Sequence, residues 1–119
     1  MKRVVLIFFG CSLLFAQSIG PISITSTQCA TIPTNQRATV YMQVIGTWTG
    51  TLQPQALING QPPFNVQVTP AATSTPQDTI TADGAYYARV AGYSAFTLCG
   101  NTVGSGTAIV YLNASQAPH

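Results

Sequence analysis

The chain has 119 residues, enough for one domain around a single hydrophobic core but too few for two. Only 5% of its residues are charged while 46% are hydrophobic, which excludes intrinsic disorder because disorder requires low hydrophobicity. Beyond the N-terminus, no apolar run approaches the ~20 residues that a membrane-spanning helix needs. The composition therefore indicates a small globular domain with no membrane span in its mature form.

The N-terminus has the pattern of a cleavable signal peptide. A positively charged start and an apolar stretch precede Ala16, the small residue that a signal peptidase requires before its cut. We therefore predict a signal peptide over residues 1–16, a single domain over residues 17–119, and a secreted or cell-surface location. A lipoprotein is the alternative, because Gly10-Cys11 fits the end of a lipid-attachment box.

Cleavage would leave two cysteines, Cys29 and Cys99, in an oxidising compartment. We expect a disulfide between them, worth roughly 4 kcal/mol in the chain-entropy model. With Phe96 and Leu98 facing inward, alternation puts Cys99 on the outward side of its strand. The bond is therefore expected at a sheet face or edge and not through the core.

Outside the leader the charges nearly cancel, since Arg37 and Arg89 stand against Asp78 and Asp83 and neither Glu nor Lys occurs. A near-neutral domain lacks the basic face that neutralises phosphates, so no nucleic-acid partner is expected. It also lacks the charge repulsion that keeps proteins apart. Self-association or binding to a surface protein is therefore favoured.

The remaining sequence carries the signals of short strands: frequent Thr, Val, Ile and Tyr, period-two alternation, and turns rich in Gly, Pro, Asn and Asp. Strands are predicted at residues 22–24, 38–45, 52–58, 64–68, 86–90, 96–98 and 108–112. Asn59-Gly60 is expected to form a hairpin turn, and residues 70–79 a loop. The spacing predicts an all-β antiparallel sandwich of about seven or eight short strands, with immunoglobulin-like or jelly-roll-like topology.

The sequence has too few histidines and carboxylates for catalysis or metal binding. His119 is the only histidine and the last residue, and the only carboxylates, Asp78 and Asp83, lie in or beside turns. A nucleophile–histidine pair, a glycosidase pair of carboxylates or a calcium site each needs more such groups. We expect no enzymatic activity, no cofactor and no metal site.

Aromatic side chains are the remaining candidates for binding. Tyr41, Tyr87 and Arg89 fall on the outward sides of their strands, and such residues are favoured interface anchors that can stack on sugar rings. High strand propensity is the competing explanation for an exposed tyrosine. Trp48 shares the phase of the inward residues before it, which favours a core role, unless a bulge at Gly46 turns it outward.

Glycine and threonine recur in VIGTWTGT at 44–51, VQVTP at 66–70, VAGY at 90–93, and the segment 105–115. This pattern resembles small β-sandwich modules of bacteriophage virion proteins, such as tail, receptor-binding or head-decoration components. The resemblance implies a non-catalytic structural or surface-binding module. Virion proteins assemble in the cytoplasm without signal peptides, so an exported cellular protein that shares this module fits the sequence equally well.

The sequence thus favours a secreted, non-enzymatic module that assembles or attaches at a cell or particle surface. Unpaired edge strands without lysine would also favour association. The alternative function is carbohydrate binding, with Trp48 or the tyrosines as stacking platforms and a polysaccharide as the partner.

Overall fold

The computed structural model describes residues 16–116, so the predicted signal peptide and His119 lie outside the described residues, except for Ala16. Within this range no helix is long and apolar enough to cross a membrane. The described elements are all strands: β1 (Ala16–Ile24), β2 (Cys29–Pro33), β3 (Thr39–Ile45), β4 (Trp48–Thr49), β5 (Leu52–Leu57), β6 (Phe64–Asn65), β7 (Thr69–Pro70), β8 (Gly84–Arg89), β9 (Ala95–Gly100), β10 (Ser105–Gly106) and β11 (Ala108–Ser115).

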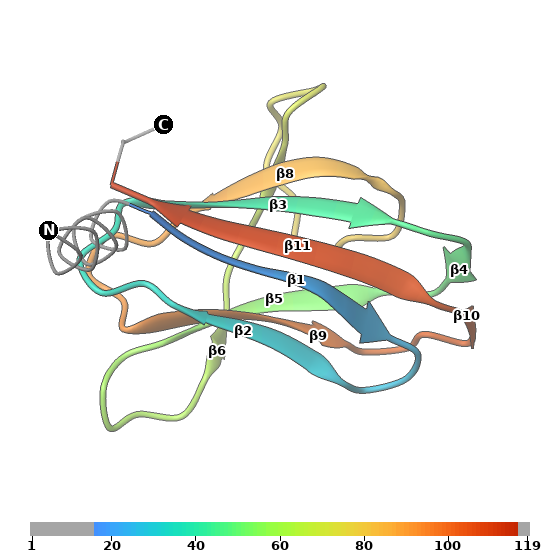
Figure 1. Cartoon of the computed structure of the whole chain (residues 1–119), viewed down its shortest axis with the longest axis horizontal. Coiled ribbons are helices and arrows are strands. Elements are labelled where there is room, and N and C mark those ends of the chain that lie inside the picture. Colours follow the sequence, from blue (N-terminus) through green and yellow to red (C-terminus); the bar gives the residue numbers. More distant parts are fainter. Residues whose placement is uncertain (1–15, 117–119) are drawn as a thin grey trace, which may run out of the picture.

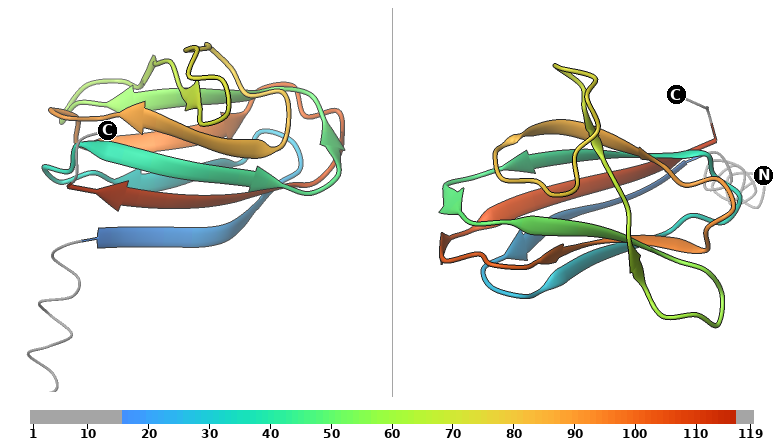
Figure 2. Two further views of the ribbon diagram at one scale, coloured as in Figure 1. Left: turned by 90° about the horizontal axis from the view of Figure 1, so that it is seen from above. Right: turned by 180° about the vertical axis from the view of Figure 1, so that it is seen from behind.

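Two antiparallel sheets enclose the core (Figures 1 and 2). One has the order β1-β11-β3-β8-β7, the other has the order β2-β9-β5-β6, and β4 pairs with β10 in a separate two-stranded ribbon. The all-β antiparallel prediction is confirmed. The predicted number of strands is too low, because the described residues form 11 strands in three sheets.

The missed strands are short or weakly patterned. β2 has the sequence CATIP, in which only Ala30 and Ile32 point inward before a proline ends the strand. β4, β7 and β10 have two residues each, too few for a period of two to be visible, whereas β6 was predicted at residues 64–68 but is only two residues long. β7 lies at the start of the segment expected to be a loop, where it pairs with β8.

The core comes from the inward residues of both sheets. Val40, Met42 and Val44 of β3 are buried opposite Phe96 and Leu98 of β9, as their alternation predicts. Phe96 heads the fully buried side chains by volume. Burial of each such side chain contributes about 1.5–3 kcal/mol, so the pattern of alternation fixes which face of every long strand points outward.

The disulfide joins Cys29 of β2 to Cys99 of β9, as predicted. The Gly100 N–H donates to the Gln28 carbonyl at 2.9 Å, so the adjacent Cys29–Cys99 pair occupies a position without backbone hydrogen bonds, where paired residues approach most closely. Their Cα atoms are 4.0 Å apart. Cys29 is exposed, and the bond therefore lies on the outer face of the four-stranded sheet, as expected.

The sheet edges are blunted without lysine, contrary to the expectation of open edge strands. The pairing of β1 shifts register between Ile19 and Ile22, where Gly20-Pro21 interrupts the ladder. β2 ends on Pro33, and the opposite edges, β6 and β7, have two residues each. Bulges, prolines and very short strands all hinder pairing with another chain. Association through strand edges is therefore disfavoured.

Candidate binding face

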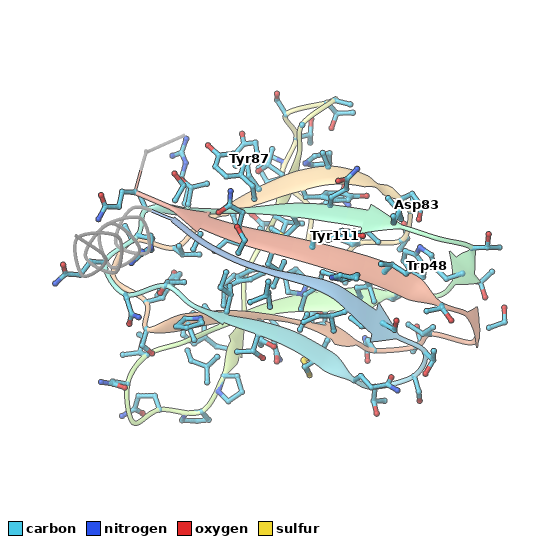
Figure 3. The ribbon with its side chains drawn as sticks, viewed as in Figure 1. Trp48, Asp83, Tyr87 and Tyr111 are labelled. Atoms are coloured by element: carbon cyan, nitrogen blue, oxygen red, sulfur yellow. A yellow bond between two sulfur atoms is a disulfide. The ribbon has the colours of Figure 1, made fainter. Side chains whose placement is uncertain are left out.

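Three tyrosines lie on neighbouring strands of the five-stranded sheet and point away from the core. Each tyrosine stands between two buried residues of its own strand, so alternation brings all three to the same side. The buried neighbours are Val40 and Met42 around Tyr41, Tyr86 and Ala88 around Tyr87, and Val110 and Leu112 around Tyr111. Figure 3 shows Tyr87 beside β8 and Tyr111 beside β11. We call this surface the tyrosine face and define it by Tyr41, Gln43, Tyr87, Arg89, Tyr111 and Asn113.

Tyr41 and Tyr87 are direct partners across β3 and β8. The Val90 N–H donates to the Ala38 carbonyl at 2.8 Å, which assigns the Tyr41–Tyr87 pair to the closely spaced positions without backbone hydrogen bonds. Their ring centroids are 6.5 Å apart, with an angle of 49° between the planes. Such aromatic cross-strand pairs stabilise a sheet and hold both rings in defined positions.

Tyr111 is held by a glycine of the edge strand. Gly20 has φ +129°, and a Cβ atom placed on it would lie 2.9 Å from Tyr111 Cδ2 and 2.9 Å from the Val110 carbonyl oxygen. Only glycine fits there, and the tyrosine ring covers the place that a side chain would fill. Tyr111 is absent from the binding residues predicted from the sequence, although its position between Val110 and Leu112 indicates an outward side chain.

Two hollows border the tyrosine face. The smaller, of about 370 Å³, lies over β1, β11 and β3 and is lined by Ser18, Tyr41, Gln43, Tyr111 and Asn113, among others. The larger, of about 560 Å³, lies beside β8, where its lining includes Phe64, Tyr87, Arg89 and Tyr93. Tyr41 lines one hollow and Tyr87 the other, so the contacting tyrosine pair borders both.

The polar side-chain groups that line the smaller hollow are only partly hydrogen-bonded. The Ser18 hydroxyl donates to Asn113 Oδ1 at 3.3 Å. Within residues 16–116 the Gln43 amide and the Tyr111 hydroxyl have no side-chain hydrogen bond. Among residues 16–116, no carboxylate or cationic side chain lines this hollow. It therefore offers uncharged donors and acceptors next to two aromatic rings.

Trp48 lies at neither position considered from the sequence. It is half-buried on the β4–β10 ribbon, packs against the core, and donates its indole N–H to Asp83 Oδ1 at 2.7 Å (Figure 3). Gly46, with φ +108°, interrupts the alternation that connected Trp48 to the inward residues of β3. The indole therefore links the ribbon to the start of β8 and is not brought together with the tyrosines.

The two carboxylates bond to neutral groups in separate places. Asp83 accepts the Trp48 N–H, and Asp78 accepts a hydrogen bond from the Gln67 amide at 2.9 Å. Tyr86, next to Asp83, donates its hydroxyl to the Ala82 carbonyl at 2.7 Å. Burial raises the pKa of Tyr86, and the negative charge of Asp83 raises that pKa further. Among the described residues no cluster of three metal-ligating side chains occurs.

The outer face of the four-stranded sheet is built from small polar residues. We call it the threonine face and define it by Cys29, Thr31, Gln53, Gln55, Thr97 and Cys99. Thr31 and Thr97 are cross-strand partners joined by a hydrogen bond of 2.8 Å between their hydroxyls, and Gln55 donates to Asn65 at 3.0 Å. Gln53 donates to the Pro54 and Asp78 carbonyls, so both amides and both threonine hydroxyls of this face have hydrogen bonds within the protein.

No family model and no curated protein matches the chain. Solved structures share its fold, and two of them are phage-derived or exported proteins. The SPBc2 prophage-derived protein YomS aligns with a TM-score of 0.74 and 12% identity over 83% of this chain and 91% of YomS. The PBSX exported protein XepA aligns with the same TM-score, 12% identity and the same coverage of this chain, but over only 37% of XepA. The resemblance to a phage β-module is thereby confirmed at the level of the fold.

Proposed function

We propose that the chain is a non-enzymatic structural module of an exported or phage-related assembly, which attaches to a surface through its tyrosine face. The observation that carries the proposal is the gathering of Tyr41, Tyr87 and Tyr111 on three neighbouring strands, facing outward. The strands run side by side in one sheet, so the rings are presented on a rigid surface.

The composition of the tyrosine face supports attachment. Tyrosine and arginine are enriched among interface anchors, whereas other charged residues are depleted. Arg89 is the only charged residue of this face, and no acidic residue belongs to it. Tyrosine presents a large amphipathic surface and loses little conformational entropy when bound. The face is thus suited to a partner that is itself largely uncharged.

Two further observations support an exported, non-catalytic role. The N-terminal pattern predicts export, and one neighbour in fold, XepA, is described as an exported protein. Asp78 and Asp83 are each hydrogen-bonded to a neutral side chain, which is the behaviour of structural carboxylates and not of a catalytic pair.

Hydroxyl-radical footprinting tests this proposal whatever the chemical nature of the partner. Oxidation rates are compared between the purified protein and the protein in place on intact producing cells or particles. Attachment through the tyrosine face is expected to slow oxidation of Tyr87 and Tyr111 by about fivefold or more, as burial in an interface core excludes water. Ile58, 45% exposed in the β5–β6 loop, is the internal control and should react equally in both samples. Equal rates at Tyr111, or protection confined to the threonine face, would overturn the proposal.

A further inference from the structure

We infer that the smaller hollow of the tyrosine face binds a neutral sugar ring, a hexopyranose unit of an uncharged polysaccharide. This inference rests on the proposed function and names the chemistry of the surface to which the module attaches. The volume of about 370 Å³ lies at the lower end of the range for small-molecule sites, so it suits a single ring better than a large ligand.

The strand register alternates aromatic and amide side chains across the hollow. Tyr41 of β3 stands opposite Asn113 of β11, and Gln43 stands opposite Tyr111. The two tyrosines therefore occupy one diagonal and the two amides the other. Diagonal neighbours remain within reach of aromatic and long side chains, so one ligand of modest size can touch all four.

A pyranose ring has the matching chemistry. Its C–H groups form an apolar surface that packs against the negative face of an aromatic ring. Its hydroxyls each donate and accept, as do the primary amides of Gln43 and Asn113, and the Tyr111 hydroxyl adds a further group of this kind. The Gln43 amide and the Tyr111 hydroxyl have no side-chain hydrogen bond within residues 16–116, so both can bond to a ligand without breaking an existing contact.

Charge argues against other small ligands. A phosphate, a sulfate or an acidic sugar needs a cationic or backbone N–H cradle, and a cationic ligand needs a carboxylate. The smaller hollow is lined by neither charge, whereas the larger one includes Arg89. A neutral ligand therefore loses the least hydration free energy when it moves from water into this site.

The contact with Gly20 explains the position of the Tyr111 ring but not its exposure or its hydroxyl group. Covering a glycine explains where the ring sits. It leaves 39% of the residue exposed and its hydroxyl without a protein hydrogen bond among the described residues. A purely structural role would be served equally by phenylalanine.

Affinity gel electrophoresis tests the inference. The purified protein is run through gels that contain hydroxyethyl cellulose, glycogen, laminarin or glycol chitin, which differ in sugar and linkage. At least one neutral polysaccharide is expected to retard it, and Tyr41→Ala and Tyr111→Ala should each weaken binding by about tenfold or more, as for loss of an aromatic anchor. Tyr111→Phe should weaken binding less, because the ring remains.

Control variants separate binding from folding. Gln43→Ala is expected to weaken binding without changing the melting temperature, because its amide has no side-chain hydrogen bond to lose within residues 16–116. Gln55→Ala on the threonine face should bind like the native protein. Absence of retardation in every gel, or retardation that survives both Tyr→Ala substitutions, would overturn the inference.

The experiments distinguish a failure of the proposed attachment from a failure of the proposed sugar binding. Protection of Tyr111 in the footprint without retardation in any gel would retain attachment and exclude the sugar. Concentration-dependent oligomers in light scattering that are abolished by Tyr111→Ala would instead identify a second copy of the chain as the occupant. Retardation with no protection of Tyr111 in place would mean that the site binds sugar but is not the attachment surface.

Discussion

The tyrosine face and the threonine face lie on opposite sides of one sandwich, and their strands share the same alternation of buried and exposed residues. On the threonine face, hydroxyls and amides bond to one another and a disulfide joins two neighbouring strands. On the tyrosine face, two hollows adjoin the large side chains, and the Gln43 amide and the Tyr111 hydroxyl have no side-chain hydrogen bond within residues 16–116. One face is thus cross-linked within the domain, and the other is the surface through which we propose attachment.

This difference between the faces shows how an almost uncharged domain can keep its fold and still present a surface suited to the attachment that we propose. Binding requires groups that are not fully satisfied within the protein, and such groups contribute little to stability. Separating the two tasks on opposite faces lets each be changed alone. Substitutions on the threonine face should therefore change the free energy of unfolding, and those on the tyrosine face should change attachment.

The largest expected effect comes from the disulfide of the threonine face. The double substitution Cys29→Ser and Cys99→Ser removes a link between residues 70 positions apart. It is expected to lower the free energy of unfolding by roughly 4 kcal/mol in the chain-entropy model. Urea denaturation measures the loss, with the native protein under reducing conditions as the matched control. A loss below about 1 kcal/mol would show that the threonine face depends little on its disulfide.

Gly20→Ala is the exception on the tyrosine side, because it should destabilise by about 2 kcal/mol or more. The new Cβ atom meets the Val110 carbonyl and Tyr111 while the backbone keeps φ +129°. Gly60→Ala is the matched control, since Gly60 also has positive φ, +79°, but nothing within 4 Å of its Cβ position. It should cost about 1 kcal/mol. Equal losses in thermal unfolding would mean that the contact with Tyr111 does not constrain Gly20.

Two buried threonines give the sharpest comparison. Thr97, on the threonine face, bonds to Thr31 at 2.8 Å and to the Ala30 carbonyl at 3.2 Å. Thr39, on the outer side of the five-stranded sheet, has no hydrogen-bond partner for its hydroxyl within residues 16–116. Thr97→Val should lower the free energy of unfolding by about 1 kcal/mol, whereas Thr39→Val should be neutral or stabilising. Equal losses would show that the two faces do not differ in polar satisfaction.

The pH dependence of Tyr86 should be a smaller effect. Its pKa is raised in the folded protein, first by burial and then by Asp83, so the unfolded chain loses the phenolic proton first as the pH rises. Stability from this group is complete below about pH 10, the ordinary tyrosine pKa, and is lost as the pH rises through the folded value. Melting temperatures between pH 8 and 11 should fall less steeply in Tyr86→Phe. Asp83→Asn should flatten the slope only in part, because burial is the larger cause.

The sequence predicted the long strands and the outward positions on them. In β3, β8, β9 and β11 the alternation of apolar residues decides both, because a slip of one residue would expose the core side chains. The disulfide followed from the two cysteines of the mature domain, and its place on a sheet face followed from the same parity. Local patterns could not predict the two-residue strands β4, β7 and β10, which are defined only by pairing with their partners, and they overestimated the length of β6.

The sequence allowed only part of the tyrosine face to be predicted. Tyr41 and Tyr87 were found by parity, but their pairing depends on the register of β3 against β8, which no local pattern contains. The position of Trp48 stayed open in the sequence because Gly46 breaks the alternation, and its partner, Asp83, lies 35 residues away. The hollow beside Tyr111 depends on Gly20 of the edge strand, and that contact exists only after β1 pairs with β11.

The most direct test of the central claim compares matched variants of the two faces for attachment. Producing cultures are separated by sedimentation, and the protein is measured in the pellet and the supernatant, with melting temperatures recorded for each purified variant. We predict that Tyr87→Ala with Arg89→Ala moves the protein into the supernatant while it remains folded, with only the loss of stability expected from one aromatic cross-strand pair, whereas Thr31→Ala with Gln55→Ala leaves it in the pellet. Retention of the tyrosine-face variant, or release of the threonine-face variant while it remains folded, would contradict this division of tasks between the faces.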